Sequence, residues 1–118
     1  MSADTMKIGR QGERLAARYL WWRGYAILER NYRRGHHEID LIAFHRSSKT
    51  LVFVEVKSRT STEFGLPREY VNKNKQRFVK QAAMAYLGGC PKSYKTIRFD
   101  VIEVYMPQGR IEHLQNAF

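Results

Sequence analysis

Two different periodicities of apolar residues along the chain predict where helices and strands form. Between residues 9 and 23 apolar side chains recur at helical spacing, and Gly24 supplies a stop. After a loop ending at Pro67, a second helical stripe runs from about residue 69 to 87. Its members are Val71, Phe78, Val79, Ala82, Ala83, Tyr86 and Leu87, and the segment closes at Gly88, Gly89 and Pro91.

The remaining apolar runs are short and rich in β-branched or aromatic residues, which is typical of strands. Five strands are predicted, at residues 25–33, 37–45, 50–59, 96–105 and 110–114. Gly35 marks a turn after the first of them, and the polar loop 46–49 joins the second to the third. The order is αβββαβ with an extra terminal strand. It predicts an α/β protein of the α+β kind, a mixed central sheet flanked by helices. At 118 residues the chain fits one domain, residues 1–118.

The hairpin around loop 46–49 predicts which side chains face each other. If the four-residue loop is symmetric, Asp40 lies opposite Glu55 and Glu38 opposite Lys57. Strand alternation then puts these four on one face. Opposed Cβ atoms lie about 4.5–5.5 Å apart, so two carboxylates can hold one cation there. The other face is predicted to be apolar and buried, with Ile39, Leu41 and Ala43 against Val52, Val54 and Val56.

Charge changes this picture, because the chain carries 21 Lys plus Arg against 11 Asp plus Glu, a net charge of +10. Such a balance favours a polyanionic partner, nucleic acid first and an anionic membrane surface second. Only residues 37–56 are net negative, through Glu38, Asp40 and Glu55. An acidic trio within a basic protein suits a cation site facing a polyanion. A chance cluster of solvated charges is the alternative.

Cysteine usage and the N-terminus narrow the class of protein. The single cysteine, Cys90, rules out an internal disulfide, and it forms no zinc-ligand spacing with the four histidines. No apolar run approaches the ~20 residues that span a bilayer, and residues 1–9 lack an apolar signal region. We therefore expect a cytoplasmic protein that is not bound to a membrane.

Two facing carboxylates repel, so one would titrate high without a cation between them. Hard oxygen ligands suit Mg²⁺ or Mn²⁺. Lys57, on the same strand and face as Glu55, would sit beside the metal and act on an attacking water or on a phosphate. Each of these residues taken alone is also compatible with an ordinary surface charge.

Three further residues have both a structural and a functional interpretation. Glu13 falls in the first turn of the predicted N-terminal helix, where the dipole favours an acid, but it shares a face with Ala16, Ala17 and Leu20 and could point to the sheet. Lys75 belongs to a basic helix start that could simply be solvated. Asp100 lies inside an apolar strand and needs a partner, for which Arg98 is the local candidate.

Several short motifs occur in order along the chain: GRQGE at 9–13, ILERNYR at 27–33, EIDLIA at 38–43, VFVEVKSR at 52–59, Lys75 with the following Ala82-Ala83 and Tyr86-Leu87, RFDVI at 98–102 and NAF at 116–118. Together these motifs resemble the YraN family of small bacterial proteins. It covers nearly the whole chain. That family is similar to archaeal Holliday-junction resolvases and shares the restriction-endonuclease-like, PD-(D/E)XK fold.

The resemblance implies a role for each motif residue. Asp40 and Glu55 would be metal ligands with the Val56 carbonyl as a third, Lys57 the catalytic lysine and Glu13 an auxiliary catalytic acid. The family usually has Gly where this chain has His37. On the predicted register His37 points away from Asp40, so the site should survive.

The expected function is a nuclease that uses Mg²⁺ or Mn²⁺ and acts on DNA, in particular structured or branched DNA. One alternative is a non-catalytic nucleic-acid-binding module of the same fold, and another is a docking subunit for an acidic protein or a membrane. DNA phosphates would be bound by Arg30, Arg33, Arg34, Arg59, Lys73, Lys75 and Arg77. A homodimer is compatible with this interpretation.

Overall fold

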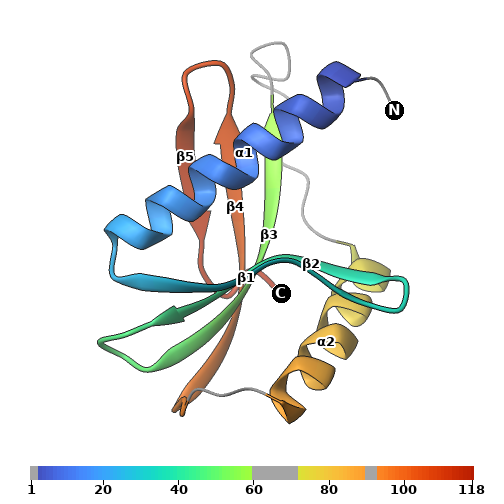
Figure 1. The fold of residues 1–118 in the computed structure, drawn as a ribbon, viewed down its shortest axis with the longest axis vertical. Helices are drawn as coiled ribbons and strands as arrows, with labels where there is room; N and C mark the ends of the chain where they lie inside the picture. Colours follow the sequence, from blue (N-terminus) through green and yellow to red (C-terminus); the bar gives the residue numbers. More distant parts are fainter. Residues whose placement is uncertain (1–2, 60–71, 90–92) are drawn as a thin grey trace.

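The computed structural model describes residues 3–59, 72–89 and 93–118, which form two helices and one five-stranded sheet (Figure 1). The helices and strands follow in the predicted order along the chain. Their bounds are α1 Ala3–Trp22, β1 Tyr25–Arg34, β2 His37–His45, β3 Thr50–Arg59, α2 Lys73–Gly88, β4 Thr96–Tyr105 and β5 Arg110–Leu114.

The sheet is mixed, with strand order β1-β2-β3-β4-β5. Strands β3 and β4 are parallel, while the other neighbouring pairs are antiparallel. A parallel pair needs a crossover connection, and α2 belongs to the chain segment that makes it. Helices α1 and α2 lie on opposite faces of the sheet (Figure 1). The predicted α+β architecture, consistent with the restriction-endonuclease-like fold, is confirmed.

Each face of the sheet has its own hydrophobic core, because the buried strand residues alternate between the two helices. The core under α1 contains Ala16, Ala17, Leu20, Tyr25, Leu41, Ala43, Val52, Val54, Ile102, Val104 and Met106. The core under α2 contains Ile39, Ile42, Leu51, Phe53, Val79, Ala82 and Ala83. Strands β2 and β3 supply both cores, and β3 is the middle strand of the sheet, with its first six residues buried.

Most element bounds follow the prediction, and the N-terminal helix differs. Helix α1 begins at Ala3 rather than near Gly9, so Glu13 lies in the middle of the helix and not in its first turn. The dipole explanation for Glu13 is therefore wrong. Helix α2 begins at Lys73, where the Asn72 side chain caps it by accepting a hydrogen bond from the Lys75 N–H. The predicted loop end at Pro67, the helical start at 69–71 and the stop at Pro91 lie outside the described residues.

The predicted hairpin register is confirmed for the part of the ladder that forms. Strands β2 and β3 pair from Leu41 opposite Val54 to His45 opposite Thr50. At the end away from the turn, the ladder stops at the pair of Leu41 and Val54, one pair before Asp40 and Glu55. Beyond this point β2 continues with β1 as a two-stranded hairpin that turns away from β3 and passes over α2 (Figure 1).

The predicted face of Ile39 is wrong. Ile39 packs in the core under α2, not with Leu41 and Ala43 under α1. The β1–β2 ladder skips the pair of Asn31 and Asp40, and Asn31 has a left-handed φ of 52°. This interruption breaks the alternation of side chains between Ile39 and Leu41. The His37 side chain lies on the same face of the sheet as Ile39, because its ring stacks on Phe78 of α2 with centroids 4.8 Å apart.

Candidate active site

Asp40 and Glu55 come together where β2 separates from β3. The Asp40 carboxylate accepts a hydrogen bond from the Val56 backbone N–H at 2.8 Å, which takes the place of the strand pairing that ends at Leu41. This bond ties Asp40 to the residue that follows Glu55. The expected convergence of the two carboxyl groups is thus produced by the separation of the strands as well as by their register.

Glu55 is the more buried member of the pair, with only 4% of the residue exposed. Burial, followed by the charge of Asp40, raises the pKa of Glu55 to about 8 against the pull of Lys75. Its Oε1 atom is buried and has no hydrogen-bond partner among the described residues. A buried carboxylate oxygen without a partner is costly, since water is removed and nothing replaces it.

Asp40 is affected by the same neighbours. Burial raises its pKa, while the Val56 N–H and the charge of Lys75 act in the opposite direction, and Glu38 adds to the rise. Both carboxyl groups are thus harder to ionise than in water. A positive charge between them would reverse this effect for both.

Two lysines lie next to the carboxylate pair. The Lys75 ammonium of α2 is 3.6 Å from Glu55 Oε2, and its side chain remains 41% exposed. Lys57 follows Glu55 by two residues on β3 and is partly buried, and its charge lowers the pKa of Glu55. Lys75, expected in the basic surface that contacts DNA but also compatible with a contact to the site, therefore lies next to Glu55.

Glu13 is brought to the site from α1 through Asn31. With its amide oriented to satisfy both neighbours, the Asn31 side chain donates to Glu13 Oε1 at 2.7 Å and to Glu38 Oε1 at 3.2 Å. Burial raises the pKa of Glu13, and the charges of Asp40 and Glu38 raise it further. Glu13 therefore points to the sheet and is electrostatically linked to Asp40. We call Glu13, Glu38, Asp40 and Glu55 the acidic cluster.

A glycine permits the close approach of α1 to this region. A Cβ atom at Gly12 would lie 1.9 Å from Ser58 Oγ on β3. Ser58 in turn donates to the Ile8 carbonyl at 3.5 Å. Gly12 thus allows the helix to bring Glu13 close to the strands.

Glu38 does not contribute as the hairpin model predicted. It was expected opposite Lys57, but the β2–β3 ladder ends before this pair. Glu38 instead forms an ion pair with Arg33 at 3.3 Å and accepts from Asn31. The sequence offered no signal for Asn31, whose role depends on its left-handed backbone.

The residues present fit a hard divalent cation better than a soft one. Among the described residues no group of three or more His, Cys, Asp or Glu side chains is arranged to hold a metal ion. Asp40 and Glu55 supply two carboxylates, and the buried Oε1 of Glu55 is an unused oxygen ligand. Backbone carbonyls and water complete such sites for Mg²⁺, which keeps several of its waters.

The residues expected to bind nucleic acid lie in three places. Arg30, Arg33 and Arg34 are exposed on β1. Lys73 and Arg77 line a surface hollow on the outer side of α2. Arg59 differs, because its Nε donates to the buried Glu103 at 2.9 Å and its side chain is only 13% exposed.

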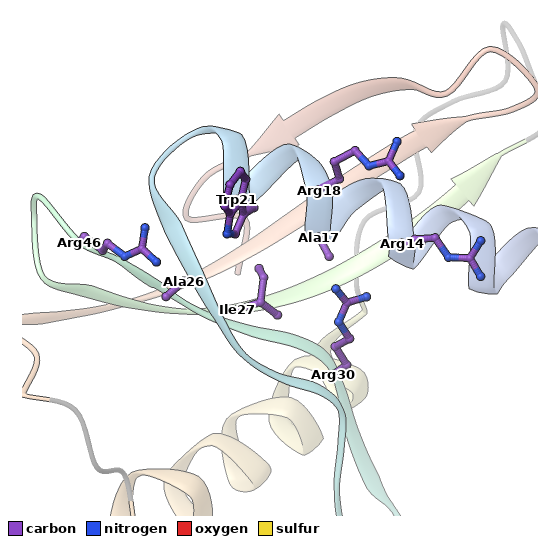
Figure 2. A pocket seen from close by; sticks show the side chains of 8 residues that line it. All are labelled: Arg14, Ala17, Arg18, Trp21, Ala26, Ile27, Arg30 and Arg46. Carbon is purple, nitrogen blue, oxygen red and sulfur yellow. The ribbon is translucent and has the colours of Figure 1, made fainter.

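A further basic surface was not foreseen. A hollow between α1, β1 and the β2–β3 turn is lined by Arg14, Ala17, Arg18, Trp21, Ala26, Ile27, Arg30 and Arg46 (Figure 2). We call it the arginine groove. Of its residues, only Arg30 was expected to bind nucleic acid.

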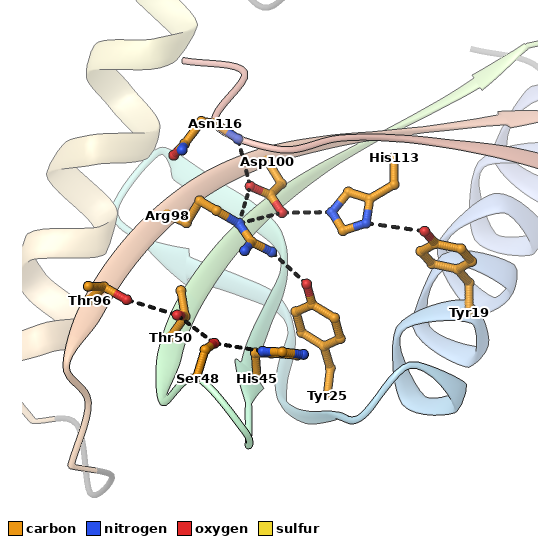
Figure 3. A network of polar contacts seen from close by, with 10 residues as sticks. All are labelled: Tyr19, Tyr25, His45, Ser48, Thr50, Thr96, Arg98, Asp100, His113 and Asn116. Carbon is orange, nitrogen blue, oxygen red and sulfur yellow. Dashed lines mark hydrogen bonds and ion pairs between the residues drawn. The ribbon is translucent and has the colours of Figure 1, made fainter.

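Asp100 has the structural partner that its place in an apolar strand required. Its carboxylate is fully buried and accepts from Arg98 Nε at 2.9 Å, from His113 at 2.7 Å and from the Asn116 backbone N–H at 3.0 Å (Figure 3). Burial opposes ionisation, but these bonds lower the pKa of Asp100. Arg98 also donates to the Tyr25 hydroxyl. This network joins β4 to β5 and to β1, which gives it a structural role.

Together, the mixed sheet and the helix on each face define an α+β domain. Its candidate site, the pair of Asp40 and the buried Glu55, lies where two strands separate. The chain belongs to the UPF0102 family, because the model of the "Uncharacterised protein family UPF0102" matches residues 12–104.

Relatives from distant bacteria match over almost their whole length. A UPF0102 protein of Chlorobium chlorochromatii is 50% identical, over 98% of this chain and 93% of its own. UPF0102 proteins of Chlorobium phaeobacteroides and Rhodococcus opacus are 45% and 40% identical, over 100% and 98% of this chain and 98% and 99% of their own. Neither described helix is long and apolar enough to cross a membrane.

Proposed function

We propose that this protein is a divalent-metal-dependent nuclease that hydrolyses phosphodiester bonds in DNA, with structured or branched DNA as the substrate. The observation that carries the proposal is the pairing of a buried carboxyl group, Glu55, with the half-buried carboxyl group of Asp40. Glu55 is 4% exposed, has an unpartnered Oε1 and lies beside Asp40. Two carboxylates that repel each other, one of them buried, do not stabilise a fold by themselves, whereas a cation site requires them.

In this proposal Asp40 and Glu55 hold Mg²⁺ or Mn²⁺, with the Val56 carbonyl as a further ligand. When bound, such an ion polarises a phosphoryl oxygen and lowers the pKa of a bound water. Lys57 would orient a water molecule or neutralise a phosphate oxygen. Lys75 limits the repulsion between the carboxylates from the α2 side. Glu13 adds a further acid from α1.

The surrounding charge fits a DNA substrate. Arg30, Arg33 and Arg34 on one side and Lys73 and Arg77 on the other are exposed basic residues on the elements that border the site. Such residues bind phosphates without reading base sequence. The net charge of +10 would attract a polyanion to this surface.

One observation favours the second candidate, a non-catalytic nucleic-acid-binding module. Lys75 already lies 3.6 Å from Glu55, so an ammonium group partly neutralises the pair without a metal. The two functions differ in one respect, because only the nuclease turns over DNA when Mg²⁺ or Mn²⁺ is added.

The test is cleavage of labelled linear, flapped and four-way DNA with Mg²⁺ or Mn²⁺, alongside DNA binding in EDTA. We expect Asp40→Asn, Glu55→Gln and Lys57→Ala each to abolish cleavage while DNA affinity stays near that of the parent protein. Lys95→Ala, an exposed lysine ahead of β4, is the matched control and should retain cleavage. Cleavage at the parental rate by the Asp40 or Glu55 variant would refute this site. If the parent binds DNA but cleaves none of the panel, the binding module is the better description.

A further inference from the structure

The arginine groove combines positive charge with an exposed aromatic ring. Its lining residues include four arginines and no acidic residue. Among the described residues none of these four guanidinium groups forms an ion pair with a carboxylate. Four like charges facing one hollow repel one another, so the groove is suited to an anionic occupant.

Trp21 lies at one end of the groove and is 55% exposed. Figure 2 shows Trp21 and Arg46 toward one end, and Arg14 and Arg30 toward the other. A large exposed aromatic side chain beside unpaired arginines is typical of surfaces that stack bases and bind phosphates.

Backbone hydrogen bonds fix the end of the groove that contains Trp21. The Gly24 N–H donates to the Trp21 carbonyl at 3.2 Å, and the Arg46 N–H donates to the Gly24 carbonyl at 3.2 Å. Gly24 has a φ of 88°, which favours glycine. The α1–β1 turn and the β2–β3 turn are thus joined, and Trp21 and Arg46 are held near each other before any ligand arrives.

The floor of the groove is small and apolar, being made of Ala17, Ala26 and Ile27. Its cavity volume of about 460 Å³ lies within the range of small-molecule sites, so one unpaired base fits. From residue 14 to residue 21 the helix rises about 10 Å. This corresponds to about three nucleotides at the ~3.4 Å rise of one strand.

The groove leads toward the acidic cluster. Arg14 follows Glu13 in α1, and Arg30 precedes Asn31, whose amide bonds both Glu13 and Glu38. A strand that lies along the groove would therefore pass from Trp21 to the side of the cluster formed by Glu13.

We propose that the arginine groove binds a short single-stranded segment of nucleic acid, with its phosphates on Arg14, Arg18, Arg30 and Arg46 and an unpaired base stacked on Trp21. The inference rests on nucleic acid as the substrate class of the proposed function, but not on cleavage. It predicts that a branched or overhanging end is preferred to a blunt duplex. A blunt duplex offers no unpaired base to the indole ring.

The first test uses the two tryptophans of the chain, Trp21 and Trp22, which are the only ones in the sequence. The Trp22→Phe variant keeps only Trp21, which lines the groove. The Trp21→Phe variant keeps only Trp22, which is 75% exposed and does not line the groove. Both variants are titrated with a dT12 oligonucleotide in EDTA. We expect strong quenching of tryptophan fluorescence in Trp22→Phe and little in Trp21→Phe. Equal quenching in both would overturn the proposal.

The second test measures affinity by fluorescence anisotropy with labelled dT12 and with a blunt duplex, again in EDTA. Trp21→Ala should weaken dT12 binding by roughly 5-fold to 150-fold, the range for loss of one stacked base. The matched control, Trp22→Phe, keeps an aromatic ring beside Trp21, whose ring centroid lies 5.4 Å from that of Trp22, and should have little effect. An equal loss in the two variants would contradict the assignment of the stacking site.

The arginines are tested with a charge-matched pair of double variants. Arg18→Gln with Arg46→Gln removes two charges from the groove, and Lys95→Gln with Arg110→Gln removes two charges elsewhere. The groove double variant should lose at least tenfold more dT12 affinity than the control. Equal losses would mean that only net charge matters and would overturn the groove. Tighter binding of the parent to polyglutamate than to dT12 would assign the groove to an acidic protein instead.

Failure of this inference is distinguishable from failure of the proposed function. If the parent protein binds neither dT12 nor any duplex, nucleic acid is not the substrate class and both fail. If the parent binds and cleaves duplex DNA while the groove variants behave as their controls, only the groove proposal fails.

Discussion

Replacing Glu55 with glutamine should stabilise the metal-free protein, although the residue is buried in the centre of the proposed site. The substitution keeps the size of the side chain and removes one of two repelling carboxylates. The pKa of Glu55 is raised from its ordinary value of 4.5 to about 8, first by burial and then by the charge of Asp40. A group whose pKa is raised on folding contributes most stability below pH 4.5, and this contribution is lost as the pH rises through about 8.

The size of the effect follows from these two pKa values. Each pH unit between the unfolded-state and folded-state values changes the free energy of unfolding by about 1.4 kcal/mol. At pH 7 the unfolded chain ionises Glu55 while the folded protein keeps it mostly protonated, so up to about 3 kcal/mol of the stability present at pH 4.5 is lost. Glutamine ionises in neither state, although it also loses the 3.6 Å contact of the carboxyl group with Lys75. We expect a net gain of about 1–3 kcal/mol at pH 7 and less than about 1 kcal/mol at pH 5.

The assay is urea unfolding followed by far-UV circular dichroism at pH 5, 7 and 8 in EDTA. Glu29→Gln, a substitution at an exposed glutamate of β1, is the matched control and should show little change at any pH. The measurements are then repeated with Mg²⁺ or Mn²⁺. A cation that binds only the folded protein at a hundred times its Kd adds about 2.7 kcal/mol to the parent. The variant should lose most of this gain.

Two results would refute the reasoning. If Glu55→Gln destabilises the metal-free protein at pH 8, the Glu55 carboxylate is stabilised by partners within the fold. If the difference between variant and parent does not change between pH 5 and pH 8, ionisation of Glu55 is not coupled to folding.

Three other predictions follow from the charges and the buried network. If ~4–6 phosphates are contacted, a plot of log K for duplex DNA against log salt concentration should have a slope of about −4 to −5. A slope near zero would show that the positive charge serves another purpose. Substituting Lys73 and Arg77 together by glutamine should lower DNA affinity measured by anisotropy and flatten that slope by about 2, because two exposed phosphate contacts are removed. Asp100→Asn should cost about 3–5 kcal/mol in urea unfolding at pH 7, since Arg98, whose side chain is only 15% exposed, loses its ionic partner. Because the pKa of Asp100 is lowered on folding, its contribution to the free energy of unfolding is present above about pH 4 and is lost as the pH falls through its folded pKa. The difference in stability between the parent and Asp100→Asn should therefore shrink in acid. A difference that stays constant with pH would contradict this explanation.

The elements and the hairpin register were predictable because they depend on neighbours along the chain. The strands 37–45, 50–59, 96–105 and 110–114 have the predicted bounds. Alternation of apolar residues and a four-residue loop leave one register that buries the apolar face. That register predicts that Asp40 and Glu55 lie together, although the ladder ends one pair before them.

The face of Ile39 and the partner of Glu38 could not be predicted, because a regular strand was assumed where the strand is interrupted. The left-handed backbone at Asn31 and the separation of β2 from β3 are not visible in a hydrophobic pattern. Because of these two features, Glu38 forms an ion pair with Arg33 and accepts a hydrogen bond from Asn31. Interruptions of this kind depend on how the hairpin packs on α2, which no local rule describes.

The sequence by itself determined the order of the elements, the register of the central hairpin and the pair of carboxylates on it, since these follow from periodicity and loop length. Only the tertiary structure decided that Lys75 pairs with Glu55, and that Trp21 and Arg46 border one groove. These residues are far apart in the chain. Their distances are set by which face each helix buries and by close approaches such as that of Gly12 to Ser58. Packing of helices on the sheet is a property of the whole core, so it becomes visible only when all the elements are assembled.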